Sequence, residues 1–93
     1  MIAILRAHGA ELRAAGIKRM SLFGSVARGD SGPDSDVDLV VELDRAARIG
    51  LIRLIGLEEE IGELVGHKVE LLPEPIEKAR LRANIERDRK LVF

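Results

Sequence analysis

Apolar and polar positions follow helical spacing first and strand spacing next, and this alternation recurs along the chain. In Met1–Ala15, apolar residues recur at helical intervals, and Gly16 follows at a typical C-terminal stop. The apolar stripe of this segment consists of Ile2, Leu5 and Leu12. The next segment, Ile17–Phe23, ends in apolar residues and predicts a strand.

The middle of the chain combines a turn-rich stretch with a strongly apolar one. Ser25–Arg28 predicts a short helix, and Gly29–Ser35 is dense in turn formers, which indicates a surface loop. The following segment, Val37–Leu43, has the β-branched and apolar residues of a buried strand. Because consecutive residues of this strand are apolar, we expect it to be central in a sheet.

The second half of the chain continues the alternation of helix and strand. Asp44 is a possible N-cap for an amphipathic helix that ends near Val65. The apolar stripe of this helix consists of Leu54, Leu57, Ile61 and Leu64. Further on, His67–Leu72 predicts a third strand, Ile76–Asp88 a charged helix, and Leu91–Phe93 a docked tail or short strand. We therefore predict an α+β (or α/β) fold with helices on one or both faces of a small sheet, whose strand order the pattern leaves open.

Composition narrows the possible classes of function. The chain has 93 residues, enough for a single domain over residues 1–93, and its net charge of −1 gives no support to direct nucleic-acid binding. The aromatic residues are Phe23 and Phe93 alone, so base stacking on aromatic side chains is nearly excluded. The absence of cysteine excludes disulfides and thiolate chemistry. No apolar run reaches the roughly 18 residues of a membrane helix, and no signal peptide stands out, so we expect a cytoplasmic protein without membrane contact.

The candidate chemistry lies in Gly24-Ser25 and, after ten further residues, Asp36-Val37-Asp38. Successive side chains of a strand alternate between faces, so Asp36 and Asp38 point the same way. Raised pKa values or a bound cation relieve the repulsion between two such carboxylates, and their oxygens favour Mg²⁺ or Mn²⁺. Gly24 lets a ligand approach the backbone, and Ser25 offers a hydroxyl and an N–H group near a predicted helix N-terminus. Together these residues predict a site for a metal-bound nucleoside triphosphate.

Each half of this pattern also has a simpler interpretation. An Asp-x-Asp pair is common at the exposed start of a strand, and Gly-Ser occurs in many turns. The combination of the two halves, each with a predicted strand, is what makes the pattern specific.

The stretch LFGSVARGDSGPDSDVDLVVEL resembles the signature of the DNA polymerase β-type nucleotidyltransferase superfamily, and most narrowly that of the minimal nucleotidyltransferases, GS-x10-DxD. The residues that match this spacing without a gap are Gly24, Ser25, Asp36 and Asp38. Arg28-Gly29 and Ser35 also fit the family's usual context, and HKVELLPEPI is similar to its third strand. The resemblance covers nearly the whole chain and implies the polymerase β-type fold, a small mixed β-sheet flanked by helices.

The resemblance implies a role for each matched residue. Asp36 and Asp38 would bind two divalent cations, Mg²⁺ or Mn²⁺, together with the phosphates of ATP. Ser25 and the backbone of Gly24 would hold the β- and γ-phosphates. Ser35 would belong to the same nucleotide-binding set.

Arg28 and Glu70 each have two interpretations. Arg28 could neutralise charge on the triphosphate or be a solvated loop arginine. A third carboxylate normally completes this site from the next strand, and Glu70 is the candidate where the family usually has Asp. Its extra methylene displaces the carboxylate by about 1 Å or more, a misplacement that can cost roughly 10²-fold in rate. The alternative is a strand glutamate that faces solvent.

In the family that the chain resembles, minimal proteins are commonly antitoxins that transfer AMP from ATP to a tyrosine of a HEPN-domain ribonuclease toxin. The chain contains no tyrosine, so a tyrosine target must lie on another protein. We therefore predict an antitoxin-type protein adenylyltransferase with a HEPN toxin as its partner. The alternative is a binding module with a degenerate site that masks its partner. An enzyme that modifies a small hydroxylated molecule is a weaker interpretation, because the chain leaves no room for an acceptor-binding domain.

Two charged runs and both histidines are interpreted as lying outside the site. Glu58–Glu60 predicts a solvated helix face. The basic segment Lys78–Lys90 predicts a solvated helix or an interface with an acidic partner. We expect His8 and His67 to be packing or surface residues.

Overall fold

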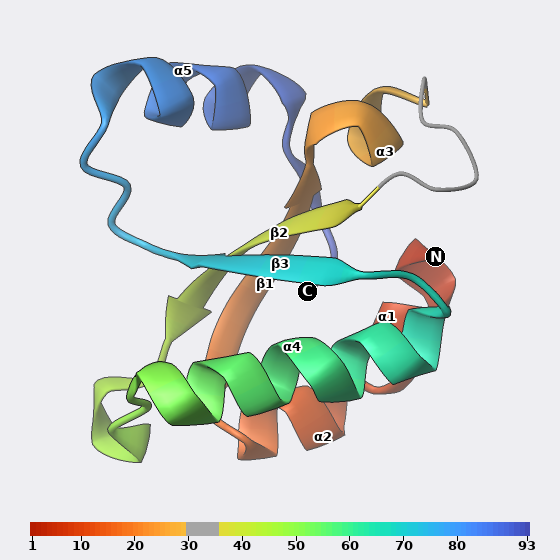
Figure 1. The fold of residues 1–93 in the computed structure, drawn as a ribbon, viewed down its shortest axis with the longest axis vertical. Coiled ribbons are helices and arrows are strands. Elements are labelled where there is room, and N and C mark those ends of the chain that lie inside the picture. The colour runs from red at the N-terminus through yellow and green to blue at the C-terminus, as the bar shows by residue number, and fades with distance from the viewer. Residues whose placement is uncertain (30–35) are drawn as a thin grey trace.

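The computed structural model describes residues 1–29 and 36–93, so the predicted site residue Ser35 lies outside the described residues. The helices are α1 (Ile2–Ala7), α2 (Gly9–Ala14), α3 (Gly24–Arg28), α4 (Leu51–Val65) and α5 (Ala79–Asp88), with a 3₁₀ turn η1 (Arg45–Ala47). The strands are β1 (Ile17–Phe23), β2 (Val37–Leu43), β3 (Val69–Pro73) and β4 (Lys90–Leu91). Figure 1 shows one sheet with helices on both sides, so the predicted α+β fold is confirmed. None of the helices in the described ranges combines the length and apolarity needed to cross a bilayer.

The strands form one mixed sheet in the order β3-β2-β1-β4. β1 pairs antiparallel with β2 and with β4, whereas β2 and β3 run parallel. β2 is thus an interior strand, and its Val40 and Val41 are both buried although they point to opposite faces. The prediction of a central strand is confirmed. The strand order, which the sequence pattern left open, places β2 directly beside β3.

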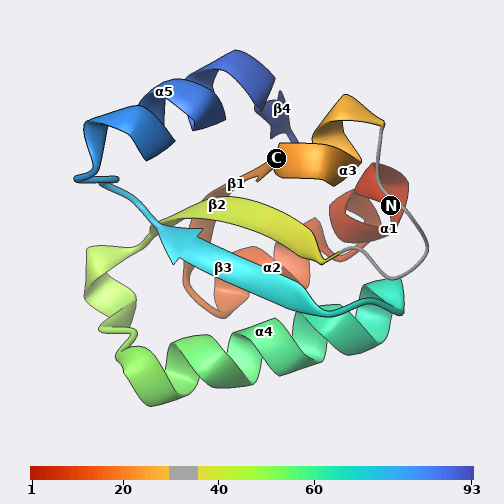
Figure 2. The ribbon, with the colours of Figure 1, turned by 45° about the horizontal axis from the view of Figure 1, so that its top comes forward.

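The two faces of the sheet are covered unequally. α1, α2 and α4 cover one face with an aliphatic core that includes Leu57 of α4 and Leu39 of β2. On the opposite face, Ile85 of α5 packs in a smaller cluster with Phe23 and Val40. α3 lies beside α5 at the end of the sheet where β2 and β3 begin (Figure 2). At this end of the α5 face Glu70 of β3 is exposed, and this is the place to look for a site.

The predicted first helix is wrong as a single element, because Met1–Ala15 forms two helices with a break at His8. His8 has a φ of −99° and a ψ of 12°, outside regular helical geometry. Gly9 follows the break and lies against Phe93, since a Cβ at this position would be 3.7 Å from the Phe93 ring. The last residue of the chain thus packs at the break, a long-range contact that helical periodicity does not encode.

Several other predicted elements keep their type but change their bounds. Asp44 accepts a hydrogen bond from the Ala46 N–H at 3.0 Å and caps η1, whereas α4 begins at Leu51. α5 begins at Ala79, and Ile76, predicted as its start, packs against the smaller core instead. The predicted short strand near the C-terminus forms as β4 and pairs with β1.

Candidate active site

Strands β1 and β2 bring the two halves of the sequence motif together. Phe23, the last residue of β1, is the register partner of Asp38 in β2. The chain then turns into α3 at Gly24, whose φ of +78° lies in the left-handed region that glycine tolerates. A Cβ at Gly24 would lie only 2.7 Å from the Oδ2 atom of Asp38. The glycine therefore leaves room for the Asp38 carboxylate at the start of α3.

A second carboxylate lies beside Asp38 on the neighbouring strand. Asp38 and Glu70 are register partners in the parallel pair β2–β3, so their side chains project from the same face. Asp36 directly precedes β2. Burial raises the pKa of Asp38, and the negative charges of Glu70 and Asp36 raise it further. Asp36 and Glu70 thus both lie close enough to Asp38 to act on its carboxyl group.

The position of Glu70 bears on both interpretations of this residue. Its side chain is exposed, as expected for a strand glutamate that faces solvent. It also lies beside Asp38 and contributes to the raised pKa of that carboxyl. Glu70 is therefore available as a third carboxylate.

The carboxylates suit a hard divalent cation that arrives with phosphate groups. Within residues 1–29 and 36–93, no three His, Cys, Asp or Glu side chains form a group that could hold a metal ion by itself. Magnesium usually takes one or two carboxylates plus substrate phosphates, so a complete protein cage is not required. The carboxylate oxygens of Asp36 and Asp38 fit this chemistry, because a cation would relieve the repulsion that raises the pKa of Asp38.

Ser25 and Arg28 lie on α3, which begins at the carboxylate site. Ser25 follows Gly24 as the second residue of this helix and is half-buried. Arg28 is the last residue of the helix and not a loop residue, and its side chain is exposed. Its Nη1 atom donates a hydrogen bond to the Oδ2 atom of Asp88 at 3.1 Å. This ion pair joins α3 to the end of α5.

Asp88 is a residue that the sequence reasoning missed. Its carboxylate also accepts hydrogen bonds from the Nε and Nη2 atoms of Arg87, at 3.1 and 3.2 Å. The hydrogen bond from Arg87, together with that from Arg28, holds the pKa of Asp88 below its usual value. Arg28 and Asp88 are 60 positions apart, so no local pattern could have paired them.

The basic segment Lys78–Lys90 is more than a solvated helix. Arg89 is partly buried, and its Nη2 atom donates to the Oγ atom of Ser21 at 3.1 Å and to Oε1 of Glu74 at 3.2 Å. Its Nη1 atom donates to Oε1 of Glu86 at 2.7 Å. Because Ser21 is buried in β1, these bonds fix the segment after α5 on the sheet.

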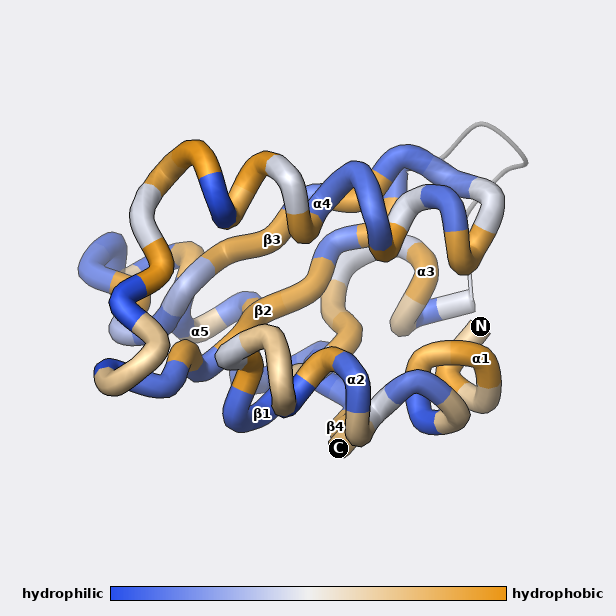
Figure 3. The backbone as a smooth tube through the Cα atoms, turned by 90° about the horizontal axis from the view of Figure 1, so that it is seen from below, coloured by the Kyte–Doolittle hydropathy of each residue, from blue (hydrophilic) through white to orange (hydrophobic). Residues whose placement is uncertain are grey.

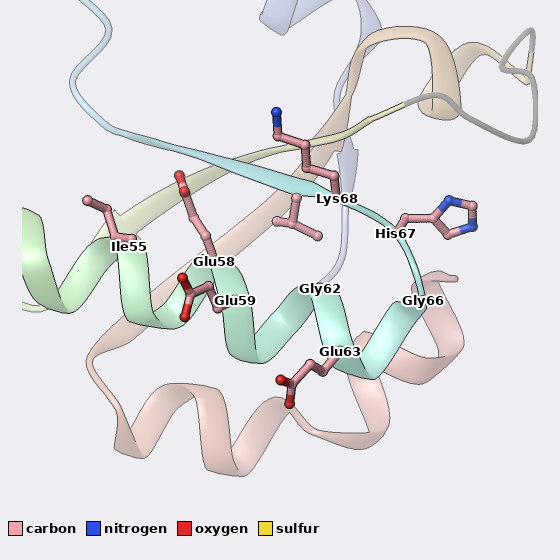
Figure 4. Close-up of a pocket in the computed structure, with 9 residues that line it drawn as sticks. Ile55, Glu58, Glu59, Gly62, Glu63, Gly66, His67 and Lys68 are labelled. Carbon is pink, nitrogen blue, oxygen red and sulfur yellow. The ribbon is translucent and has the colours of Figure 1, made fainter.

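A groove separate from the carboxylate site runs between α4 and the edge strand β3 (Figure 4). The residues lining it include Glu58, Glu59, Glu63, His67 and Lys68. Glu58 accepts a hydrogen bond from the Leu71 N–H at 3.0 Å, so the prediction of a solvated face is wrong for this residue. Its carboxylate satisfies a donor on the sheet edge, where an unpaired N–H group invites pairing with another chain.

Comparison with known proteins identifies the family of this chain. The sequence model of the family described as "Nucleotidyltransferase domain" matches residues 5–92. The chain is 35% identical over 86 residues to the protein adenylyltransferase MntA of Thermococcus cleftensis, which covers 91% of this chain and 85% of that relative. These matches confirm the resemblance that the Gly-Ser and Asp-x-Asp motif indicated.

Solved structures share the fold. A chain of a toxin–antitoxin complex with AMP-PNP matches with a TM-score of 0.76 at 20% identity, over 95% of this chain and 72% of that chain. A chain of the complex between the tri-AMPylated Shewanella oneidensis HEPN toxin and its MNT antitoxin matches with a TM-score of 0.70 at 18% identity, over 100% and 72%. A protein assigned as a minimal nucleotidyltransferase matches with a TM-score of 0.74 at 30% identity, over 96% and 93%. The predicted polymerase β-type fold is therefore confirmed.

Proposed function

The chain belongs to the nucleotidyltransferase domain family, and on that premise we propose that it is an antitoxin-type protein adenylyltransferase. It would transfer AMP from ATP to a tyrosine hydroxyl of a partner HEPN ribonuclease toxin. One relative is a protein adenylyltransferase, and one structural neighbour comes from a complex with an AMPylated HEPN toxin, which supports this reaction. The observation that carries the proposal is the close approach of Gly24 to Asp38, which unites the Gly-Ser turn with the carboxylates.

Each residue of the site has a task in this proposal. Asp36 and Asp38 would hold Mg²⁺ or Mn²⁺, which when bound supplies Lewis-acid stabilisation of the phosphate oxygens. Gly24 and Ser25 present the start of α3 to the β- and γ-phosphates of ATP. Arg28 adds a positive charge at the other end of the same helix, where its ion pair with α5 restricts its position.

The transfer step needs an acceptor oxygen in line with the α-phosphorus of ATP. The tyrosine oxygen forms a bond to this phosphorus, the bond to the bridging oxygen breaks, and pyrophosphate leaves. We assign the uptake of the tyrosine proton to Glu70, which lies exposed beside Asp38. Because the chain has no tyrosine, the acceptor comes from the partner.

Incubation of the chain with ATP labelled on the α-phosphate, Mg²⁺ and the candidate toxin tests the reaction. We expect covalent label on the toxin, lost when its modified tyrosine is replaced by phenylalanine. An unlabelled toxin, under conditions in which an active relative labels its own partner, would contradict the proposal.

A binding module that masks its partner is the second candidate, favoured by Glu70 where the family usually has Asp. The double variant Asp36→Asn with Asp38→Asn separates the two candidates, because it removes charge with little change in volume. We expect AMP transfer to fall about 10³-fold or more, and toxin neutralisation in cells to fail. The matched control is Glu60→Gln with Glu77→Gln, which removes two exposed carboxylates elsewhere. Full neutralisation by the aspartate double variant would favour masking.

A further inference from the structure

The outer side of α4 carries apolar side chains that neither core uses. Leu51, Ile52 and Ile55 are 73%, 88% and 46% exposed. Gly56 adjoins them and is also partly exposed. In Figure 3 the N-terminal half of α4 is mainly hydrophobic and the C-terminal half mainly hydrophilic. Clustered apolar exposure of this kind indicates an interaction surface.

The charges along α4 and the segment before it are divided between two halves. Residues 45–57 contain three arginines and no acidic residue, whereas residues 58–65 contain four glutamates and no basic residue. The arginines are Arg45, Arg48 and Arg53, and the glutamates are Glu58, Glu59, Glu60 and Glu63. The helix dipole has the same sense, positive at the N-terminus and negative at the C-terminus. Arg53 and Glu60 form an ion pair within the helix at 3.4 Å, which leaves Arg45 and Arg48 at the positive end and Glu58, Glu59 and Glu63 at the negative end.

We propose that this surface of α4 pairs with the same surface of a second copy of the chain, with the two helices antiparallel. A two-fold interface of this kind brings one patch against itself. In the register in which Ile52 of one copy meets Ile55 of the second copy, Glu59 lies level with Arg48 of the second copy. Each apolar half thus meets an apolar half, and Glu59 of each copy lies level with an arginine of the other, whereas Glu63 lies level with Asp44.

A second copy suits this surface because the surface is complementary to itself. Antiparallel pairing joins opposite charges and opposed dipoles, whereas parallel pairing would bring like charges together. Gly56, which has no side chain, allows the two helices to approach closely near their crossing point. α4 lies on the opposite face of the sheet from α5 (Figure 2). Pairing through α4 therefore does not cover α5 or the carboxylates.

Sedimentation velocity over a range of concentrations tests the proposal. The 15 residues of α4 span roughly 22 Å, a small interface, so we expect a Kd on the order of 10 µM or weaker. Ile52→Asp should raise the Kd roughly tenfold or more without a change in melting temperature, because the side chain is 88% exposed. The matched control is Ile4→Asp on α1, where the side chain is 41% exposed, and it should dimerise normally.

A charge exchange tests the antiparallel arrangement itself. Glu59→Lys with Glu63→Lys changes the net charge of residues 58–65 from −4 to 0 and places a lysine at position 59 level with Arg48 of the second copy. Arg45→Glu with Arg48→Glu changes the net charge of residues 45–57 from +3 to −1 and places a glutamate at position 48 level with Glu59 of the second copy. Each variant alone should stay monomeric, and a mixture of the two should form dimers. A wild-type chain that stays monomeric to roughly 1 mM, or a mixture that forms no dimers, would overturn the proposal. It would also fall if Ile52→Asp weakened toxin binding while the wild type stayed monomeric, because the surface would then belong to that partner.

Discussion

One face of the sheet carries most of the hydrophobic core, and the other carries the candidate active site. Among the described residues, the larger core contains fourteen buried residues and the core on the α5 side contains three. Alternate residues of β2 belong to different faces, so Leu39 enters the larger core while Asp38 faces the site. The α5 face gives up apolar burial at the start of β2 and β3, where Asp38 and Glu70 lie side by side. The comparison teaches that a small domain can leave one end of a sheet open for a charged ligand when the other face supplies most of the core.

Truncation of one buried side chain in each core tests this comparison and has the largest expected effect on stability. Leu57→Ala in the larger core should cost about 3–4 kcal/mol of unfolding free energy, since its fully buried side chain leaves a cavity. Ile85→Ala in the smaller core should cost about 2–3 kcal/mol, because α5 can settle into the space. Urea unfolding measures both values. A greater loss of unfolding free energy for Ile85→Ala than for Leu57→Ala would contradict the conclusion that the larger core supplies most of the stability.

Gly24→Ala should reduce AMP transfer strongly and reduce the stability of the fold only slightly. The new Cβ would meet the Asp38 carboxylate at 2.7 Å and displace it, so we expect adenylyl transfer to fall roughly 10²-fold. Gly66→Ala is the matched control, because Gly66 has a similar φ of +71° and no atom within 4 Å of a new Cβ. Both variants should lose about 1 kcal/mol of stability from left-handed backbone strain. Equal transfer rates in the two variants would show that the approach of Gly24 to Asp38 is not needed for activity.

Substitution of Glu70 tests whether this residue acts as the third carboxylate of the site. Glu70→Gln should slow AMP transfer about tenfold or more, because it removes the third carboxylate. Glu70→Asp restores the residue that is usual in the family and should raise the rate, by up to roughly 10²-fold. Glu42→Gln, at the other end of β2, is the control. Single-turnover transfer to the toxin measures each rate. An unchanged rate for Glu70→Gln would favour the interpretation of Glu70 as a solvent-facing strand residue.

The smallest expected effect is on the pH dependence of stability. Burial, together with the charges of Glu70 and Asp36, raises the pKa of Asp38 in the folded state. The folded chain therefore binds this proton more tightly than the unfolded chain, so ionised Asp38 destabilises the fold at neutral pH, and this penalty disappears as the pH falls through the raised pKa. Asp38→Asn, which is neutral at every pH, should melt slightly above the wild type near pH 7, and the difference should close towards about pH 4. Thermal melts over that range check the trend, and a difference that widens on acidification would contradict it.

The sequence was sufficient to predict the elements that depend only on neighbouring residues. The strand Val37–Leu43 and the end of the helix near Val65 form as predicted, because the apolar run of the strand and the glycine that follows the helix are local signals. The break at His8 was missed, because it accompanies packing of Phe93 from the other end of the chain. Asp88 was missed for the same reason, since its partner Arg28 lies on another helix. The assignment of roles to the site residues stays a prediction.

The sequence by itself determined the motif, the identity of the carboxylates and the family, since these depend on residue type and spacing along the chain. Only the tertiary structure decided that Glu70 lies beside Asp38, because this depends on β3 pairing parallel with β2. The tertiary structure also decided that Gly24 lies against the Asp38 carboxylate and that the exposed side of α4 is left uncovered. The physical reason is that strand order and helix placement follow from the packing of distant segments, which local periodicity does not specify.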